Sequence, residues 1–430
     1  MTTEDNELIC RVGPGTPMNA MMRKYWLPVC LSGDVAEKDS HPFRVQLLGE
    51  WYVAFRDSEG RAALLDEACP HRGTSLALGR VEDCGIRCIF HGWKFGADGC
   101  LQEVPNLESS ETFRAKVRVA SYPTREAGGL VWAFLGSPED VPTFPSYNYM
   151  NLPEQSLATF GIRVECNWLQ ILEGGIDSSH LGLLHDDFHP LALPAPGESS
   201  DESTPVGVLA IDAGLEFEDH SPKLEVQLTD FGFQYAAIRE MTGGGTSGFT
   251  ADDAPTYIRV TAFAMPCMVI VGSVAIYYVP RNDYSTNWIF VVPSLDPTKE
   301  VDREVVMRNY GLVEPWYKDG VLSVAEEDRW GQDRSLMGTS FSGIPGLLRE
   351  DGAVAVAMGP IADRTKEHLV PADVAIIRAR RLLLEGVRAV ARGEEPPGRA
   401  PSDFSAIRST EGILDRGASW QEFVQHAQSL

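Results

Sequence analysis

The sequence has no run of about 18 apolar residues, and no basic, apolar, small-residue signal at its beginning. A membrane-spanning helix and a secretory signal are therefore not expected, and we expect a soluble, cytoplasmic protein. Positive charge is also scarce, because 37 Lys and Arg residues face 61 Asp and Glu residues, for a net charge of −24. No basic stripe offsets this deficit, which argues against nucleic acid as a partner.

Cysteines are few and scattered. The eight cysteines have no spacing typical of a disulfide framework, which favours a reducing compartment. The chain also lacks an internal repeat and a G-x-G-x-x-G fingerprint for a flavin or nicotinamide, so we expect any electron donor to be a separate protein. The composition is that of a globular protein, and 430 residues suggest two domains or more.

Two short segments, C-P-H-R-G and C-I-F-H-G-W, each contain one cysteine and one histidine: Cys69 with His71, and Cys88 with His91. Zinc sites of the Cys2His2 type usually place both cysteines in one pair and both histidines in the other. A 2Fe-2S cluster with two cysteines on one iron and two histidines on the other needs mixed pairs, because each loop then gives one ligand to each iron. The pattern favours this cluster, with zinc as the alternative.

The surroundings of these pairs suggest two further hypotheses. Cys84 lies four residues before Cys88, and we interpret it as a small loop residue and not as a ligand. Cations also gather here in an otherwise acidic chain, either as ordinary solvated charges or as a docking surface for an acidic electron donor. These cations are Arg72, Arg80, Arg87 and Lys94.

Periodicity predicts two structural classes along the chain. Residues near 40 to 135 contain short apolar runs separated by Gly, Asp and Pro, as in an all-β domain. A proline-rich passage at 138–153 has the composition of a linker. Alternating runs at 224–233, 257–263, 268–279 and 287–292 then predict an antiparallel sheet. The run 373–392 predicts a helix, and the polar stretch 194–205 predicts an exposed loop.

A second group of metal-binding side chains lies in residues 167–185. On a helix Glu173, Asp177 and His180 would line one face, while His185 would be turned about 140° away. Both imidazoles can reach one metal only if the helix loosens between them, and a glycine lies in that interval. Two histidines and one carboxylate on one side of the metal are typical of non-heme iron enzymes. The alternative is a pair of core histidines beside an acidic helix face.

Together the two motifs resemble the oxygenase α subunits of Rieske non-heme iron oxygenases, and most of all their phthalate dioxygenase-like branch. The segment from Asp177 to His185 matches the family's D-x2-H-x4-H motif, and V-G-P-G-T-P-M and the later G-L-L-R-E-D-G run match the branch. The resemblance implies an α+β protein with an N-terminal all-β Rieske 2Fe-2S domain at residues 24–137. It implies a catalytic domain of antiparallel sheet and helices, of the helix-grip type, at 138–430, with residues 1–23 packing on it.

The resemblance also implies the ligands. Cys69, His71, Cys88 and His91 would bind the 2Fe-2S cluster, and His180, His185 and Asp351 would bind one mononuclear Fe(II). Residue chemistry alone does not separate Asp351 from the other acids of this region, which are Glu350, Glu326, Glu327, Asp328, Asp333 and Asp363.

By the same resemblance the protein would use dioxygen as cosubstrate. NAD(P)H would supply electrons through a separate flavin and iron-sulfur reductase, with or without a ferredoxin. The two centres of one chain would lie too far apart for fast transfer, which implies a homotrimer or a dimer of trimers. Asp177 would then bridge His91 of one subunit to His180 of the next by hydrogen bonds.

The substrate implied by the branch is an aromatic carboxylate of the phthalate, phenoxybenzoate or methoxybenzoate type, which is hydroxylated, ether-cleaved or O-demethylated. Arg239 and Arg259 lie on predicted strands and are candidates to bind the carboxylate, unless they face outward. Trp288, Phe263 and Phe233 are candidates for the pocket wall, with core packing as the alternative. Two other functions remain open: a Rieske electron carrier without a mononuclear site, and a zinc-stapled binding protein.

Overall fold

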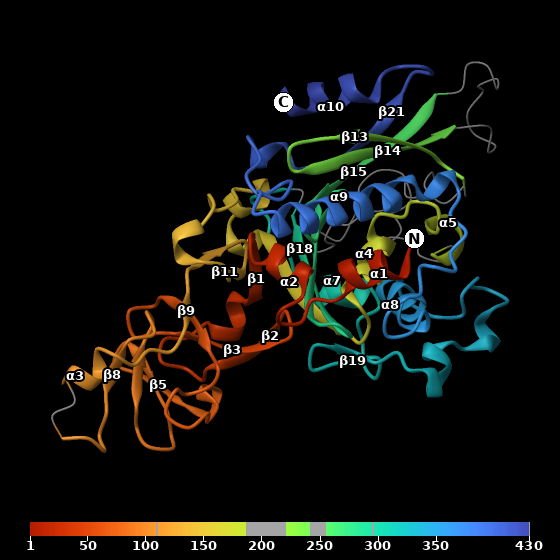
Figure 1. The fold of residues 1–430 in the computed structure, drawn as a ribbon. Helices are drawn as coiled ribbons and strands as arrows, with labels where there is room; N and C mark the ends of the chain where they lie inside the picture. Colours follow the sequence, from red (N-terminus) through yellow and green to blue (C-terminus); the bar gives the residue numbers. More distant parts are fainter. Residues whose placement is uncertain (109–110, 186–220, 241–254, 295, 430) are drawn as a thin grey trace. The chain divides into compact units, whose positions relative to one another are not determined.

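The computed structural model describes residues 1–430 except 109–110, 186–220, 241–254, 295 and 430 (Figure 1). The predicted loop at 194–205 lies outside the described residues. The chain forms two compact units. The small unit comprises Arg11–Pro145 and Val279–Asp283, and the large unit comprises Met1–Cys10, Ser146–Tyr278 and Tyr284–Leu430. No helix in the described part of the chain is long and apolar enough to cross a membrane.

The N-terminal segment is divided between the units, which differs from the predicted packing of residues 1–23 on the catalytic domain. Residues 1–10 do belong to the large unit. Residues 11–23 belong to the small unit, because the Asn19 side chain donates hydrogen bonds to backbone carbonyls there, including that of Leu48 at 3.1 Å. The small unit also extends to Pro145, beyond the predicted end at residue 137.

The small unit is built from three antiparallel sheets, as the punctuated apolar runs predict. Their orders are β1-β11-β10, β2-β3-β4-β9 and β5-β6-β7-β8. The strands are β1 (Trp26–Leu31), β2 (Phe43–Leu47), β3 (Glu50–Arg56), β4 (Ala62–Asp66), β5 (Arg80–Glu82), β6 (Gly85–Arg87), β7 (Lys94–Gly96), β8 (Leu101–Glu103), β9 (Ser121–Tyr122), β10 (Thr124–Ala127) and β11 (Leu130–Phe134). Two short helices accompany them, α2 (Pro17–Met22) and α3 (Glu111–Arg114).

A buried apolar cluster positions the two cysteine-histidine loops in this unit. The cluster combines side chains from β3, such as Phe55, with Phe95 of β7 and with the two cysteines Cys69 and Cys88 themselves. The first loop follows β4, and the second connects β6 to β7. Because strands on both sides of each loop are anchored in one core, the loops are held as a pair.

The large unit contains one ten-stranded sheet among the described residues, in the order β13-β14-β15-β16-β17-β18-β12-β20-β19, with β21 paired to β15. The strands are β12 (Leu157–Val164), β13 (Lys223–Leu228), β14 (Gly232–Glu240), β15 (Thr256–Ala264), β16 (Met268–Val271), β17 (Val274–Asn282), β18 (Ser285–Pro293), β19 (Tyr317–Lys318), β20 (Val321–Leu322) and β21 (Thr410–Leu414). The runs predicted at 224–233 and 268–279 each turned out to hold parts of two strands, because tight turns interrupt them without breaking the alternation.

Helices cover both faces of this sheet. The helices of the unit are α1 (Thr3–Cys10), α4 (Trp168–Gly175), α5 (Leu181–Leu184), α7 (Arg303–Asn309), α8 (Leu347–Ala357), α9 (Val374–Ala391) and α10 (Trp420–Ser429). Ile258 and Val260 of β15 pack against Trp420 of α10 on one face. On the other face Arg259 shares a cavity with residues of α4, α8 and α9. The 18-residue helix α9 runs along β13 and β14 and confirms the helix predicted at 373–392 (Figure 1).

Candidate functional site

Backbone hydrogen bonds close both cysteine-histidine loops of the small unit. The Gly73 N–H donates to the Cys69 carbonyl at 2.8 Å, and the Gly92 N–H donates to the Cys88 carbonyl at 3.0 Å. Both glycines adopt left-handed backbone conformations, with φ of 79° at Gly73 and 73° at Gly92, which side-chain-bearing residues rarely adopt. The two loops thus repeat one geometry, a tight turn directly after each cysteine.

The side chains of these loops meet in two pairs, the imidazoles of His71 and His91 and the thiols of Cys69 and Cys88. The rings of His71 and His91 lie 4.4 Å apart, and both cysteines are 2% exposed. Burial raises the pKa of the Cys69 thiol to about 11, a shift that a bound metal cation would reverse. His91 Nδ1 is buried and has no hydrogen-bond partner among the described residues. A buried imidazole nitrogen without a partner and two buried thiols, all from the same two loops, are the donors that a mixed-ligand 2Fe-2S cluster uses, so this set fits such a cluster.

Ion pairs occupy part of the basic region around the loops. Arg87 forms an ion pair with Glu103 at 2.8 Å, and Lys94 is buried and lies 3.2 Å from the same carboxylate. Arg72 and Arg80 are exposed, and Arg80 also lies 3.4 Å from the Glu82 carboxylate. The docking surface for an acidic donor stays a prediction, with Arg72 and Arg80 as its exposed cations, because Arg87 and Lys94 form ion pairs with Glu103.

The predicted helical face in residues 167–185 is interrupted. Helix α4 ends at Gly175, and its C-cap Ile176 has φ of −114° and ψ of 12°. Asp177 therefore lies outside the helix, and the single turn α5 separates His180 from His185. The helix breaks before both histidines and not at the glycine between them. This break is what lets both imidazoles point to one place.

Glu173 does not join Asp177 and His180, contrary to the predicted shared face. Its carboxylate is 8% exposed and accepts hydrogen bonds from Arg364 at 2.8 Å and from Arg380 at 2.6 Å. Burial alone would raise the pKa of Glu173, but the two guanidinium groups hold it below its usual range. Glu173 is therefore the centre of a buried ion-pair cluster that ties α4 to α9.

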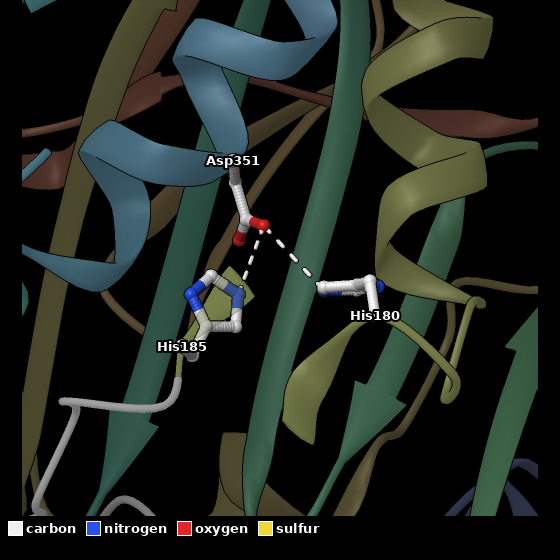
Figure 2. A group of neighbouring side chains, drawn as sticks. All are labelled: His180, His185 and Asp351. Carbon is white, nitrogen blue, oxygen red and sulfur yellow. Dashed lines mark ion pairs between the residues drawn. The ribbon is translucent and has the colours of Figure 1, made fainter. Parts of the chain in front are cut away.

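His180, His185 and Asp351 form one group, with all three candidate ligand atoms within 4.8 Å of one another. Asp351 Oδ1 lies 3.2 Å from His185 Nε2 and 3.6 Å from His180 Nε2. Figure 2 shows the carboxylate extending from α8 toward both imidazoles. Among the described residues, Asp351 is the acid that joins the two histidines in this group. The other acids considered from the sequence are not part of it: Glu350, Glu326, Glu327, Asp328, Asp333 and Asp363.

The carboxylates and imidazoles of this group shift one another's pKa values. Burial alone would lower the pKa of His185, but the carboxylates of Asp351 and Glu350 outweigh it and raise the pKa to about 10. In turn the imidazoles of His185 and His180 hold the pKa of Asp351 below its usual range, against the opposing effect of burial. A carboxylate and two imidazoles so arranged form a site for a divalent cation, which fits a mononuclear iron.

Carboxylates outside the group contact Nδ1 of both imidazoles. His185 Nδ1 lies 2.6 Å from Glu350 Oε2, and the other oxygen of Glu350 accepts a hydrogen bond from the Ser342 hydroxyl. His180 Nδ1 lies 3.5 Å from Asp177 Oδ2. With Nδ1 engaged, Nε2 of each ring is left to face Asp351, and this assignment of nitrogens follows from the hydrogen-bond network.

The group opens on a cavity of about 690 Å³ in the large unit. Of the residues predicted to line a substrate pocket, Arg259 and Trp288 do so. Phe233 and Phe263 instead pack on each other, with ring centroids 5.1 Å apart, and both are fully buried. Arg239 is also buried, and it donates a hydrogen bond to the backbone carbonyl of the residue after Asp177.

Comparisons with known proteins match both parts of the chain to known families. Residues 25–123 match the family model of the Rieske [2Fe-2S] domain, and residues 133–429 match the model of the LigXa C-terminal domain. The oxygenase subunit of phthalate 4,5-dioxygenase from Pseudomonas putida is 34% identical, over 98% of this chain and 94% of its own. The oxygenase subunit of 3-chlorobenzoate-3,4-dioxygenase from Comamonas testosteroni is also 34% identical, over 97% and 96%.

A solved structure shares the fold. The structure of NdmA from Pseudomonas putida CBB5 with caffeine matches with a TM-score of 0.56, over 94% of this chain and all of that chain, at 17% sequence identity. At that identity the match bears on the fold alone. The α+β architecture expected from the sequence, an all-β Rieske domain followed by a sheet-and-helix domain, is therefore confirmed.

Proposed function

This chain belongs to the Rieske non-heme iron oxygenases, as an oxygenase subunit, and on that premise we propose that it oxidises an aromatic carboxylate with dioxygen. NAD(P)H supplies the electrons through a separate reductase. The observation that carries this proposal is the group of His180, His185 and Asp351, which opens on the same cavity as the guanidinium of Arg259.

Two metal centres are part of the proposal. Cys69, His71, Cys88 and His91 hold the 2Fe-2S cluster, and the His180 group holds one mononuclear Fe(II). When bound, the cluster relays single electrons and the mononuclear iron activates dioxygen beside the substrate. All three candidate ligand residues of the mononuclear site line the cavity, so a substrate in the cavity would lie beside the metal that they would hold.

Support for an aromatic carboxylate comes from the wall of the cavity. Trp288, Tyr278 and Phe290 present aromatic side chains to it, and Arg259 presents a buried cation. A guanidinium with little water around it favours a carboxylate held by paired hydrogen bonds. A volume of about 690 Å³ suits a ligand with one or two aromatic rings. The names of the two relatives, which act on phthalate and on 3-chlorobenzoate, point to the same class.

Delivery of electrons between subunits is also proposed. Asp177 bridges His91 of one subunit to His180 of the next, in a homotrimer or a dimer of trimers. The 3.5 Å contact from Asp177 Oδ2 to His180 Nδ1 supports one half of such a bridge, and the Asp177 side chain is 22% exposed, which leaves it accessible for the other half. His180 and His91 are then each oriented by the same carboxylate.

The test of the function is a substrate panel with a reductase present. Oxidation of NADH should be matched by product for at least one of the benzoates, phthalates, phenoxybenzoates or methoxybenzoates. The products also distinguish ring hydroxylation from ether cleavage and O-demethylation. Arg259→Ala should raise KM strongly while Arg259→Lys, which keeps the charge but loses the paired donors, should raise it less. If Arg239→Ala and Arg259→Ala both leave KM unchanged, the carboxylate anchor is wrong.

Iron content separates this function from its two alternatives. We expect about three irons per chain and a red-brown colour, and His180→Ala should remove only the mononuclear iron. A Rieske electron carrier would hold two irons with no effect of that substitution. A zinc-stapled binding protein would be colourless. Low-temperature electron spin resonance on the same samples distinguishes cluster iron from mononuclear iron.

A further inference from the structure

Ser178 lies on the inner side of the segment that carries Asp177 and His180, and three side chains of the sheet hold it. Its hydroxyl is 3.0 Å from the Tyr235 hydroxyl and 3.4 Å from Nη2 of Arg259. Its carbonyl accepts a hydrogen bond from Arg239 at 2.9 Å. Ser178 is 1% exposed and is not part of the cavity wall, so these contacts serve the segment and not a ligand.

The segment around Ser178 is tightly closed. Asp177 Oδ1 accepts hydrogen bonds from the Ser179 N–H at 2.8 Å and from the Ser179 hydroxyl at 2.7 Å. Its other oxygen faces His180. Residues 177–180 therefore form one hydrogen-bonded turn. A displacement of Ser178 would move the carboxylate of Asp177 and the imidazole of His180 with it.

Arg259 contacts both the cavity and the turn that contains Ser178. It lines the cavity, and it also donates a hydrogen bond to Ser178. At 3.4 Å this bond to a neutral hydroxyl is at the weak end of the range. A carboxylate in the cavity offers the guanidinium charge-assisted bonds of about twice the strength. An anionic ligand would therefore draw Arg259 away from Ser178.

We propose that Arg259 and Ser178 form a sensor that couples an anionic aromatic ligand in the cavity to the position of Asp177 and His180. This inference rests on the proposed function for the class of ligand. With the cavity empty, Arg259 and Tyr235 both restrain the Ser178 hydroxyl. With a carboxylate bound, Tyr235 alone restrains it, and the turn settles in a second position. The metal-binding group is thus different in the empty and the occupied protein.

The coupling has a thermodynamic consequence with a definite sign. In the wild-type protein part of the binding free energy of the carboxylate is used to break the Arg259–Ser178 bond, whereas in Ser178→Ala there is no such bond to break. Ser178→Ala should therefore bind benzoate more tightly, by up to about five-fold, the equivalent of one ordinary hydrogen bond. A direct contact between Ser178 and the ligand would instead make the variant bind more weakly.

The experiment measures benzoate binding to the metal-loaded protein, by intrinsic tryptophan fluorescence and by calorimetry, with benzamide as the neutral isostere. We expect Ser178→Ala to lower the Kd of benzoate and to leave that of benzamide unchanged. Ser285→Ala, a buried serine at the start of β18, is the matched control and should leave both unchanged. Hydrogen exchange of residues 176–184 should respond to benzoate in the wild-type protein and respond less in Ser178→Ala.

An equal or higher Kd for benzoate in Ser178→Ala would overturn the sensor, as would absence of benzoate binding to the wild-type protein. A failure of the proposed function looks different, because carboxylates would then bind with the expected pattern yet remain unoxidised in the reductase-coupled assay. The binding measurements involve no turnover, so the two failures are distinguishable.

Discussion

Removal of the Glu350 side chain should weaken iron binding, although Glu350 is not one of the three candidate ligands. Glu350 is 1% exposed, and Oε2 lies 2.6 Å from His185 Nδ1, while the other oxygen accepts from Ser342. This bond fixes which nitrogen of His185 faces the metal and which way the ring points. Glu350→Ala would leave the ring free to rotate and Nδ1 unpaired in a buried place.

The expected size follows from the kind of bond. Hydrogen-bond partners of metal-binding histidines typically change metal affinity by about 10 to 100-fold, or about 1.4 to 2.7 kcal/mol. Because this bond is short, buried and to a charged group, Glu350→Ala should lie near 100-fold. Glu350→Gln retains an oxygen that can accept from Nδ1 and should lose only about tenfold. Asp351→Ala removes a ligand and should lose more than either.

The assay is an anaerobic titration of Fe(II) into protein from which a chelator has removed the mononuclear iron, with the cluster absorbance as an internal measure of intact protein. Asp363→Ala, at an exposed acid outside the group, is the control and should bind iron like the wild-type protein. The assignment fails if Glu350→Ala binds Fe(II) with wild-type affinity. It also fails if Asp351→Ala retains the metal while Glu350→Ala loses it, because the two acids would then have exchanged roles.

Three further substitutions test other parts of the structure. Asp177→Asn should keep both metals and the oligomer but nearly abolish turnover, measured by iron analysis, size and product formation, and normal turnover would end the bridging role. Glu173→Gln leaves two buried guanidinium groups without their anion and should lower the free energy of unfolding, measured by urea titration, by about 3 to 5 kcal/mol. The control Glu367→Gln changes a more exposed carboxylate and should lower it by less than about 1 kcal/mol. The pKa of Glu173 is lowered in the folded state, so its contribution to the free energy of unfolding is complete above its ordinary pKa and is lost as the pH falls through its folded-state pKa. Glu173→Gln should therefore reduce the loss of stability that the wild-type protein shows at acid pH. An unchanged loss of stability at acid pH would contradict this. Gly175→Ala would place a methyl group against the Tyr278 hydroxyl with too little room, and it should destabilise the protein and reshape the cavity wall, seen as altered benzoate affinity.

Much of the fold was predictable because its signals are local. Alternation over five to nine residues reveals strands, and the 18-residue amphipathic pattern of α9 reveals a helix. The turns inside 224–233 and 268–279 escaped prediction because the side chains around them continue the alternation. The division of the N-terminal segment also escaped it, since hydrogen bonds from Asn19 to distant carbonyls leave no periodic trace.

The predicted cluster ligands Cys69, His71, Cys88 and His91 follow from the sequence alone, because each cysteine-histidine pair lies in one short loop whose geometry follows from a cysteine and a nearby glycine. The pair His180 and His185 is visible in the same way. Only the tertiary structure decided the rest of the second site. It broke the helix at Ile176, assigned Glu173 to an ion-pair cluster, and placed Asp351 against Nε2 of both imidazoles, whereas Glu350 lies against Nδ1 of His185. Adjacent acids on a helix point about 100° apart, and which of them meets a distant loop depends on packing that local sequence does not encode.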